Sequence, residues 1–347
     1  MNNTEKSIKS EYESGLLNNY PHKLCGNFEE AETPLTNYKK DVDIFRKYGL
    51  TKSDLISVKM KLKKQENFLK YSYVRDNKMG TTLSLMDCTI SSNHNADRYY
   101  AEIQNRIDTL QREADKENLT PVFLTITLPS EFHPMKQKSK YDKTLIKNPK
   151  YNGVEPREAT KILTKMWAKL RHDRSLKELS KNERMYYRVN EPHKDGTPHA
   201  HFLLFIPDNK VQRVEKAFNH LYNSKANKFV KDIRSAKNYI MKYINKTLPK
   251  SKEQLTQDDE FINAWYVKHR INRFQSSRST APMYLYRLLH HRFTLYALTQ
   301  VQKGNSLKVL ARVDDDKIME IWDDNELLFM RNENIEVHTL NKSHRVA

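Results

Sequence analysis

Two strand-like runs that flank a tight turn constrain the fold of this chain more than any other feature. Residues 185–191 read as a strand that ends at Glu191, and residues 194–197 read as a Lys-Asp-Gly-Thr turn. The next run, residues 199–206, begins with His-Ala-His and continues as an apolar stretch. Asp-Gly between two such runs is typical of a β-hairpin, and an apolar run is typical of a central strand. We therefore expect a sheet built around this hairpin.

The hairpin is predicted to bring three metal-ligating side chains together. Side chains repeat every second residue along a strand, so His199 and His201 share one face. Glu191 ends the partner strand, where a completing carboxylate should stand. Imidazole suits borderline metals, and an added carboxylate admits Mg²⁺ or Mn²⁺. His193 is a weaker candidate ligand, because it lies near the turn and could face a phosphate or solvent instead.

A pair of packed or solvent-facing histidines is the alternative interpretation of His-Ala-His. The apolar residues that follow argue against it, because two unpaired histidines entering a core are costly unless they are liganded or hydrogen-bonded. We therefore predict a divalent metal site, with Mg²⁺ or Mn²⁺ as the cofactor, at Glu191, His199 and His201.

A second motif, residues 235–248, has helical periodicity with one apolar and one polar stripe. Residues four apart on a helix are neighbours, so Tyr239 and Tyr243 present two phenols about one turn apart. Tyrosine can act as a covalent nucleophile, but its pKa of about 10 requires help from a nearby cation or metal. Lys242 and Lys246 are placed to hold a phosphate and favour the phenolate. A core aromatic stripe with solvated lysines is the alternative, and the polar neighbours of the tyrosines argue against it.

Three strings, in this order, resemble the phage replication gene A protein family. They are Pro-Val-Phe-Leu-Thr-Ile-Thr-Leu-Pro-Ser-Glu-Phe-His-Pro at 121–134, Tyr-Arg-Val-Asn-Glu-Pro-His-Lys-Asp-Gly-Thr-Pro-His-Ala-His at 187–201, and Tyr-Ile-Met-Lys-Tyr-Ile-Asn-Lys at 239–246. That family consists of rolling-circle initiators within the HUH endonuclease superfamily, whose name denotes His, hydrophobic residue, His. The resemblance is firm over about residues 120–250 and faint before residue 95. Ala200 stands where a larger apolar residue is expected in many relatives.

The resemblance implies roles for the singled-out residues. His199 and His201 would be metal ligands with Glu191 as the third, and Tyr239 and Tyr243 would be nucleophiles. One tyrosine would attack a phosphodiester of single-stranded DNA at the replication origin, leaving a 5′-phosphotyrosine and a free 3′-hydroxyl. The second tyrosine would act when the origin is regenerated. Neither spacing nor neighbours in the sequence decides which tyrosine acts first.

The implied partners are the origin DNA, a host DNA polymerase that extends the 3′-hydroxyl, and a host helicase. The sequence contains no Gly-x-x-x-x-Gly-Lys-Ser/Thr loop, which fits a helicase supplied by the host.

Two alternatives to a replication initiator are a related relaxase or single-strand transposase, and a non-catalytic nucleic-acid-binding protein. The first often uses one tyrosine or places it elsewhere, and the second leaves the paired histidines and tyrosines unexplained.

Composition independently favours a nucleic-acid partner. Sixty-one Lys and Arg residues against forty-three Asp and Glu residues give a formal net charge of +18, and the pI is about 9.5. The loop at 129–152 is the most basic segment and suits origin recognition or phosphate contacts. Its lysines are Lys136, Lys138, Lys140, Lys143, Lys147 and Lys150.

The cysteine count and the hydropathy pattern exclude two other classes of protein. Two cysteines are too few for a Cys-rich zinc module. The absence of a long apolar stretch predicts a cytoplasmic protein with no membrane partner.

The order of predicted elements around the hairpin favours an α+β fold. We expect strands at 122–128, 185–191, 199–206 and 229–233, and helices at 155–172, 211–223 and 236–247. This βαββαβ order with an added helix is typical of a ferredoxin-like, or RRM-like, antiparallel sheet with helices on one face and the other face open to DNA. Thr125 and Thr127 would support the metal, contact phosphate, or simply fill their strand.

Four segments are expected along the chain. They are a flexible lead at 1–38, a helical accessory region at 39–119, the HUH endonuclease catalytic domain at 120–250, and a mostly helical C-terminal region at 251–347 whose acidic tail contains strands. Within the flanking regions we expect helices at 39–76, 96–116 and 265–278, and a linker at 251–259.

Overall fold

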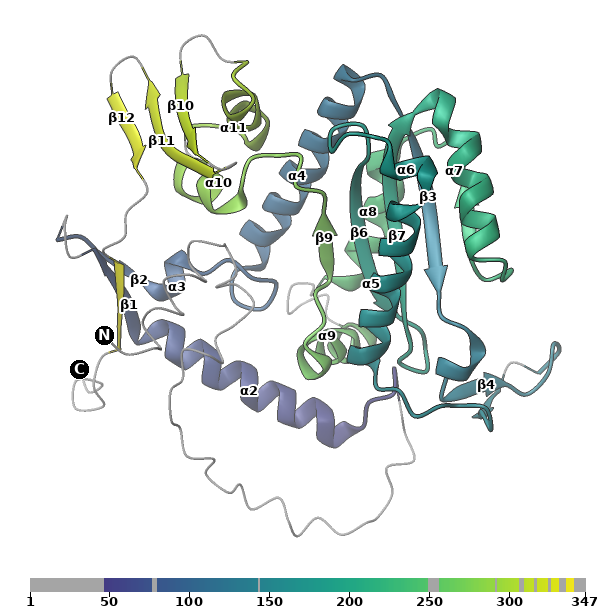
Figure 1. Cartoon of the computed structure of the whole chain (residues 1–347). Helices are drawn as coiled ribbons and strands as arrows, with labels where there is room; N and C mark the ends of the chain where they lie inside the picture. The colour runs from purple at the N-terminus through teal and green to yellow at the C-terminus, as the bar shows by residue number, and fades with distance from the viewer. Residues whose placement is uncertain are drawn as a thin grey trace. The chain divides into compact units, whose positions relative to one another are not determined.

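The computed structural model describes residues 47–76, 80–142, 144–248, 256–290, 292–305, 309–314, 317–323, 326–330 and 335–339. The predicted flexible lead at 1–38 lies outside these residues. Over the described residues the chain forms two compact units (Figure 1). We call residues 47–60 with 110–279 the sheet unit, and residues 61–109 with 280–339 the terminal unit.

The sheet unit is built on a five-stranded antiparallel sheet, which agrees with the predicted α+β class. Its strand order is β8-β3-β7-β6-β9. The strands are β3 (Leu119–Thr127), β6 (Met185–Pro192), β7 (Pro198–Pro207), β8 (Lys228–Val230) and β9 (Phe274–Ser276). The histidine strand β7 therefore lies in the centre, between β3 and β6, as its apolar sequence predicts.

One face of this sheet packs against two amphipathic helices, α5 (Pro156–His172) and α7 (Asp208–Leu221). Alternation along β3 and β7 directs one set of side chains into this core. Its buried members include Val122, Leu124, Ile126, Phe202 and Leu204 from the sheet, Leu163 and Trp167 from α5, and Val214 and Phe218 from α7. This apolar layer fixes the register of the strands, because a slip of one residue would turn the apolar set away from the helices.

The alternate side chains of the same strands point to the other face of the sheet, and they include the predicted metal ligands. There Phe123 and His201 contact the aromatic rings of α8 (Ala236–Thr247). The expectation that this face is open was therefore wrong in part, because α8 lies against it. The apolar stripe of α8 explains this position, since Ile240 and Ile244 are fully buried.

The lysine-rich segment after β3 is not the simple loop that was expected. It contains η2 (Ser130–Phe132) and a two-stranded hairpin made of β4 (Met135–Gln137) and β5 (Leu145–Lys147). Figure 1 shows this hairpin projecting beyond the end of β3. The short α6 (Arg174–Lys177) follows α5.

Two predicted helices have other boundaries in the structure. Helix α9 (Gln257–His269) begins with a capping box at Thr256 and ends at Arg270, whose φ of 52° leaves the helical region. The predicted helix at 265–278 was therefore wrong beyond His269, and β9 follows as an edge strand on β6. Residues 251–255 of the predicted linker at 251–259 lie outside the described residues, and its remainder is helical from Gln257 onward.

The predicted helix at 39–76 also differs from the structure. Residues 39–46 of this prediction lie outside the described residues, and in the described part the helix is α2 (Lys52–Lys70), after which Ser72–Asp76 forms a strand. Before α2, a bridge joins Lys47 and Leu50, and Tyr48 and Gly49 have φ of 52° and 72°. These backbone angles are incompatible with a right-handed helix. Helix α4 (Ala96–Lys116) has the predicted bounds.

The terminal unit contains more strands than its sequence suggests. A three-stranded sheet made of β10 (Val309–Asp314), β11 (Lys317–Asp323) and β12 (Glu326–Met330) follows α10 (Met283–Leu289) and α11 (Leu295–Gln302). A second sheet joins β13 (Ile335–Thr339) to β1 (Ser72–Asp76) and β2 (Thr82–Ser84), and α3 (Leu85–Cys88) follows β2. Strands in the acidic tail were expected, but the pairing of β13 with a strand more than 250 residues earlier was not.

Within the described ranges, none of the helices combines the length and the apolar character that crossing a membrane requires.

Candidate metal centre and tyrosine helix

The structure brings the three predicted ligands together at the end of the central strands. Glu191 on β6 pairs with His199 on β7, and His201 lies two residues further along the same face. The Glu191 Oε2 atom lies 3.5 Å from His199 Nε2 and 3.6 Å from His201 Nε2. One ligand atom from each residue lies within 4.8 Å of the others, so the group could hold a metal ion.

Thr125 orients one of these histidines. It faces His201 on the neighbouring strand β3, and its Oγ1 atom lies 3.1 Å from His201 Nδ1. That contact leaves Nε2 directed towards Glu191, which is how a hydrogen bond to one ring nitrogen prepares the other to bind a metal.

Unpartnered buried atoms fit a cation in this group. Among the described residues, Glu191 Oε1 and His201 Nε2 are buried without a hydrogen-bond partner. Buried polar atoms rarely lack a partner, and a bound ion is one explanation. One carboxylate with two imidazoles is a donor set that accepts several divalent metals.

The protonation states also suit a cation. Burial alone would raise the pKa of Glu191, but the adjacent imidazoles of His199 and His201 hold that pKa well below its usual range. Burial lowers the pKa of His201 to about 4. At neutral pH the group therefore consists of a charged carboxylate and a neutral His201, the forms that bind metal without first losing a proton.

The two predicted lysines on α8 differ in their relation to this group. The Lys246 Nζ atom donates to Glu191 Oε2 at 3.0 Å, which places a positive charge at the edge of the centre. Lys242 is exposed, and its Nζ atom lies 6.0 Å from the centre of the Tyr243 ring. Lys246 is thus connected directly to a predicted ligand, whereas Lys242 lies beside a predicted nucleophile.

The two tyrosines also have different neighbours, which the sequence could not distinguish. Both rings contact Phe123, with 5.1 Å between ring centres for Tyr243 and 4.5 Å for Tyr239, but the ring centre of Tyr243 also lies 3.9 Å from that of His201. The two phenol rings are 6.2 Å apart. Burial, together with the charges of Tyr239 and Glu191, raises the pKa of Tyr243. Tyr243 therefore lies nearest the candidate ligands but keeps its proton at neutral pH unless a cation stabilises the phenolate.

Local interactions hold α8 in this position. The Ser235 Oγ atom accepts a hydrogen bond from the Asn238 backbone N–H at 3.3 Å, which caps the start of the helix. Ile240 and Ile244 then bury one stripe, so that Tyr239 and Tyr243 emerge on the stripe that faces Phe123 and His201.

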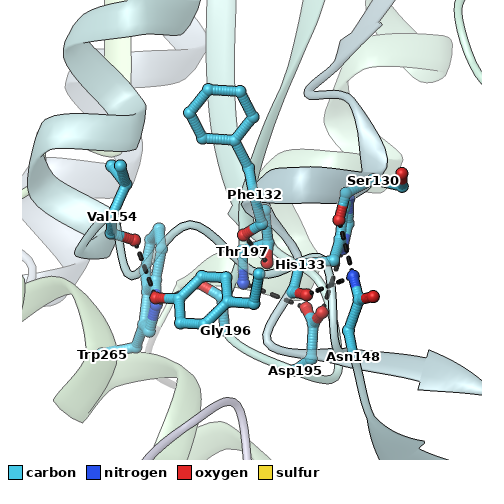
Figure 2. Close-up of polar contacts among 10 residues, drawn as sticks. Ser130, Phe132, His133, Asn148, Val154, Asp195, Gly196, Thr197 and Trp265 are labelled. Carbon is cyan, nitrogen blue, oxygen red and sulfur yellow. Dashed lines mark hydrogen bonds and ion pairs between the residues drawn. The ribbon is translucent and has the colours of Figure 1, made fainter.

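The turn between β6 and β7 is fixed by several hydrogen bonds (Figure 2). Asp195 pairs with His133 at 2.9 Å and accepts the Thr197 N–H at 3.1 Å. The Thr197 hydroxyl donates to the Phe132 carbonyl at 3.1 Å, and the Trp265 indole donates to the Gly196 carbonyl at 2.9 Å. These contacts give His133 a structural position that its spacing in the sequence did not reveal.

His193 lies beside the candidate ligands without completing the group. Its ring stacks on His199 with 4.0 Å between ring centres. Burial and the neighbouring charge of His199 lower the pKa of His193 to about 3. Among the described residues, the group of three ligand atoms contains Glu191 and not His193.

Tyr48 is a neighbour of the centre that sequence reasoning missed. Its backbone N–H donates to the Lys194 carbonyl at 3.0 Å, and a Cβ placed on Gly196 would stand 2.6 Å from the Tyr48 carbonyl oxygen. Burial raises the pKa of its phenol, which also feels the charges of Lys246 and Glu191. Its only signal in the sequence is the following Gly49, which argues against a continuous helix.

The sequence profile of the bacteriophage replication gene A protein (GPA) matches residues 45–251, which is more than half of the chain. The chain belongs to the bacteriophage replication gene A protein family. The matched region includes all the candidate ligands and both tyrosines of α8.

Several family relatives show the extent of the similarity. The "Replication protein" of Haemophilus phage HP1 is 33% identical over 181 residues, covering 48% of this chain and 21% of the relative. The "Replication gene A protein" of Escherichia phage 186 is 28% identical over 254 residues, covering 65% of this chain and 35% of the relative. A "Probable replication endonuclease from prophage-like region 1" of Salmonella typhi is 27% identical over 225 residues, covering 57% of this chain and 27% of the relative.

The chain thus matches between about a fifth and a third of the length of these relatives. No solved structure matches it significantly.

Proposed function

We propose that this chain nicks one strand of DNA at a replication origin and rejoins it through a 5′-phosphotyrosine intermediate, as a metal-dependent initiator of rolling-circle replication. The observation that carries the proposal is the position of Tyr243, whose ring lies 3.9 Å from that of His201, beside Glu191 and His199. A phenol next to two imidazoles and a carboxylate is the arrangement that a metal-assisted tyrosine nuclease requires.

The fold supports the same assignment. Without the edge strand β9, the strands in chain order are β3, β6, β7 and β8, and their order in the sheet is β8-β3-β7-β6. Helices α5 and α7 lie on one face of these strands. We infer a ferredoxin-like HUH core from this arrangement, with residues 120–250 as its catalytic domain and Mg²⁺ or Mn²⁺ at the histidines.

In the proposed reaction, Glu191, His199 and His201 hold a divalent cation. When bound, the cation supplies Lewis-acid polarisation of the scissile phosphate and a template for its oxygens. The Tyr243 phenol loses its proton and attacks phosphorus in line. The bond between phosphorus and the 3′-oxygen breaks and the 3′-oxygen takes up a proton, which leaves a free 3′-hydroxyl and a 5′-phosphotyrosine.

Lys246 has a role that follows from its ion pair with Glu191. Its ammonium group lies at the edge of the centre, where it can neutralise part of the charge that develops on the phosphate. Lys242, which is exposed beside Tyr243, can hold the neighbouring phosphate of the strand.

The different neighbours of the two tyrosines support an order of events. Tyr243 lies against His201 and makes the first cleavage, whereas Tyr239 lies against Phe123 and acts when the origin is regenerated. The freed 3′-hydroxyl then attacks the first phosphotyrosine and closes the released circle. A host helicase and a host polymerase would open and copy the duplex between the two events.

Cleavage of labelled single-stranded oligonucleotides tests the proposal. Oligonucleotides tiled from the genome that encodes the chain are incubated with Mn²⁺ or with EDTA and resolved on a denaturing gel. We expect an adduct between DNA and protein that needs Mn²⁺ and is absent from the Tyr239→Phe, Tyr243→Phe double variant. Tyr296→Phe, in the terminal unit, is the matched control. Tight binding without an adduct on any oligonucleotide would replace the nuclease by a non-catalytic DNA-binding protein.

A further inference from the structure

The hairpin that follows β3 is strongly basic and exposed. Met135 pairs with Lys147 and Gln137 pairs with Leu145 across its two strands. Asp142 is the one acidic residue in the sequence from 135 to 150, and its carboxylate lies 3.4 Å from the Lys138 ammonium. The exposed lysines of this segment are Lys136, Lys138, Lys140, Lys147 and Lys150. We call residues 135–142 and 144–147 the lysine hairpin.

The tip of the lysine hairpin is an ordered turn that holds an aromatic ring in solvent. The Ser139 Oγ atom accepts the N–H groups of Tyr141 and Asp142 at 3.2 and 2.9 Å. The Asp142 carboxylate accepts the Thr144 N–H at 3.0 Å. Tyr141 is 91% exposed, and the Lys140 ammonium lies 5.9 Å from its ring centre. The turn therefore presents a ring and a cation together.

The base of the lysine hairpin is tied to the turn of the metal centre. The buried Asn148 side chain donates to the carbonyls of Ser130 and His133, both at 2.8 Å (Figure 2). His133 in turn pairs with Asp195 on the turn between β6 and β7. The hairpin therefore starts from a fixed position beside the strands that carry the candidate ligands.

Its point of departure also lies next to those ligands. Thr127 is the last residue of β3, and it pairs with His199. The chain passes from there through η2 into β4. The base of the lysine hairpin therefore lies close in the chain to a residue that pairs with a candidate ligand.

We propose that the lysine hairpin binds the unpaired DNA that flanks the cleavage site, with the Tyr141 ring stacking on a base and the lysines contacting the backbone. This inference rests on the proposed function for the position of the cleavage site. Lysines attract phosphates of any nucleic acid, but a ring at the tip can stack only on a base that is unpaired or splayed out. The matching charge and the exposed ring together favour single-stranded DNA over a duplex.

Binding measurements can test this without interference from cleavage. Fluorescein-labelled oligonucleotides are titrated into the full chain carrying Tyr239→Phe and Tyr243→Phe, and the Kd is read from anisotropy. Adding Tyr141→Ala should weaken binding of single-stranded DNA about five- to hundredfold, the range typical of one base stacked on an aromatic ring. Tyr141→Phe, which keeps the ring, should bind within about twofold of the parent.

The charge contribution is measured by the salt dependence of Kd. Changing Lys136, Lys138 and Lys140 to Gln should reduce the slope of log K against log salt by about 2, because each phosphate contact to a single strand contributes about 0.7. The matched control is a set of three exposed lysines on α5, which packs on the face of the sheet opposite α8. They are Lys161, Lys165 and Lys169. Their replacement by Gln should change the slope by less than half as much.

Other outcomes overturn the inference. An unchanged Kd for Tyr141→Ala on single strands would remove the stacking role, and an equal loss on duplex DNA of the same sequence would assign the hairpin to duplex binding. Absence of any adduct with the unmodified chain would instead refute the proposed nuclease, while the stacking measurement would keep its meaning. The two failures are therefore distinguishable.

Discussion

The two faces of the five-stranded sheet carry different kinds of side chain, although both are largely buried. The face under α5 and α7 is mostly apolar, with Leu124, Phe202 and Leu204 fully buried. The face against α8 holds Glu191, which is 1% exposed, beside His201. Apolar burial stabilises a fold, whereas buried ionisable groups cost free energy unless they are paired or liganded. The first face therefore stabilises the sheet, and the second is suited to chemistry.

Replacing Tyr243 by Phe should cause the largest loss of cleavage activity. It should leave the apolar face of the sheet, under α5 and α7, unchanged. Formation of the first adduct should fall at least about a thousandfold, because the nucleophilic oxygen is lost while the ring that packs on His201 is kept. Gel analysis of single-turnover cleavage measures the rate. Tyr239→Phe should retain the first cleavage within about tenfold and lose the second. Equal losses in both variants would contradict the order inferred from their neighbours.

Trp167→Ala on α5 is the corresponding change on the first face. Trp167 is buried and packs on Phe202 with 4.4 Å between ring centres, so its removal should lower the free energy of unfolding by about 3–5 kcal/mol. Urea unfolding measures this change. At a temperature where the variant stays folded, its adduct rate should remain near that of the parent. A variant of normal stability but without activity would break the distinction between the faces.

Acid should destabilise the second face selectively. Folded His201 has a pKa of about 4 against its ordinary value of 6.5, so the unfolded chain binds its proton first as pH falls. Stability from the neutral imidazole is therefore complete above about pH 6.5 and is lost as pH falls towards about 4, with a loss of about 3 kcal/mol. Urea unfolding in EDTA at several pH values measures it, and His201→Gln should flatten the curve. An unchanged slope in that variant would assign the effect to other groups.

Thr125→Val should have the smallest effect. The substitution keeps the shape of the side chain but removes the hydroxyl that lies 3.1 Å from His201 Nδ1, so Mn²⁺ affinity should fall about tenfold with little change in stability. Isothermal titration calorimetry measures the affinity. Thr120→Val, on the same strand but paired with Asp208, is the control and should leave the affinity unchanged. If both variants bound Mn²⁺ with the same affinity, Thr125 would only fill space in its strand.

The sequence alone determined the elements whose signals are local. Period-two alternation and an Asp-Gly turn identified the hairpin of β6 and β7 and placed Glu191 beside His199. Helical periodicity gave α8 its observed bounds and put Tyr239 and Tyr243 on one stripe. These patterns are reliable because each depends on neighbours within a few residues.

Only the tertiary structure decided the features that join distant segments. The contact of Tyr243 with His201, the approach of Tyr48 to Gly196, and the pairing of β13 with β1 all link residues far apart in the chain. The position of α9 and β9 on the sheet belongs to the same class. Helix or strand periodicity fixes which face of an element is apolar, but packing against partners elsewhere in the chain selects what that face meets.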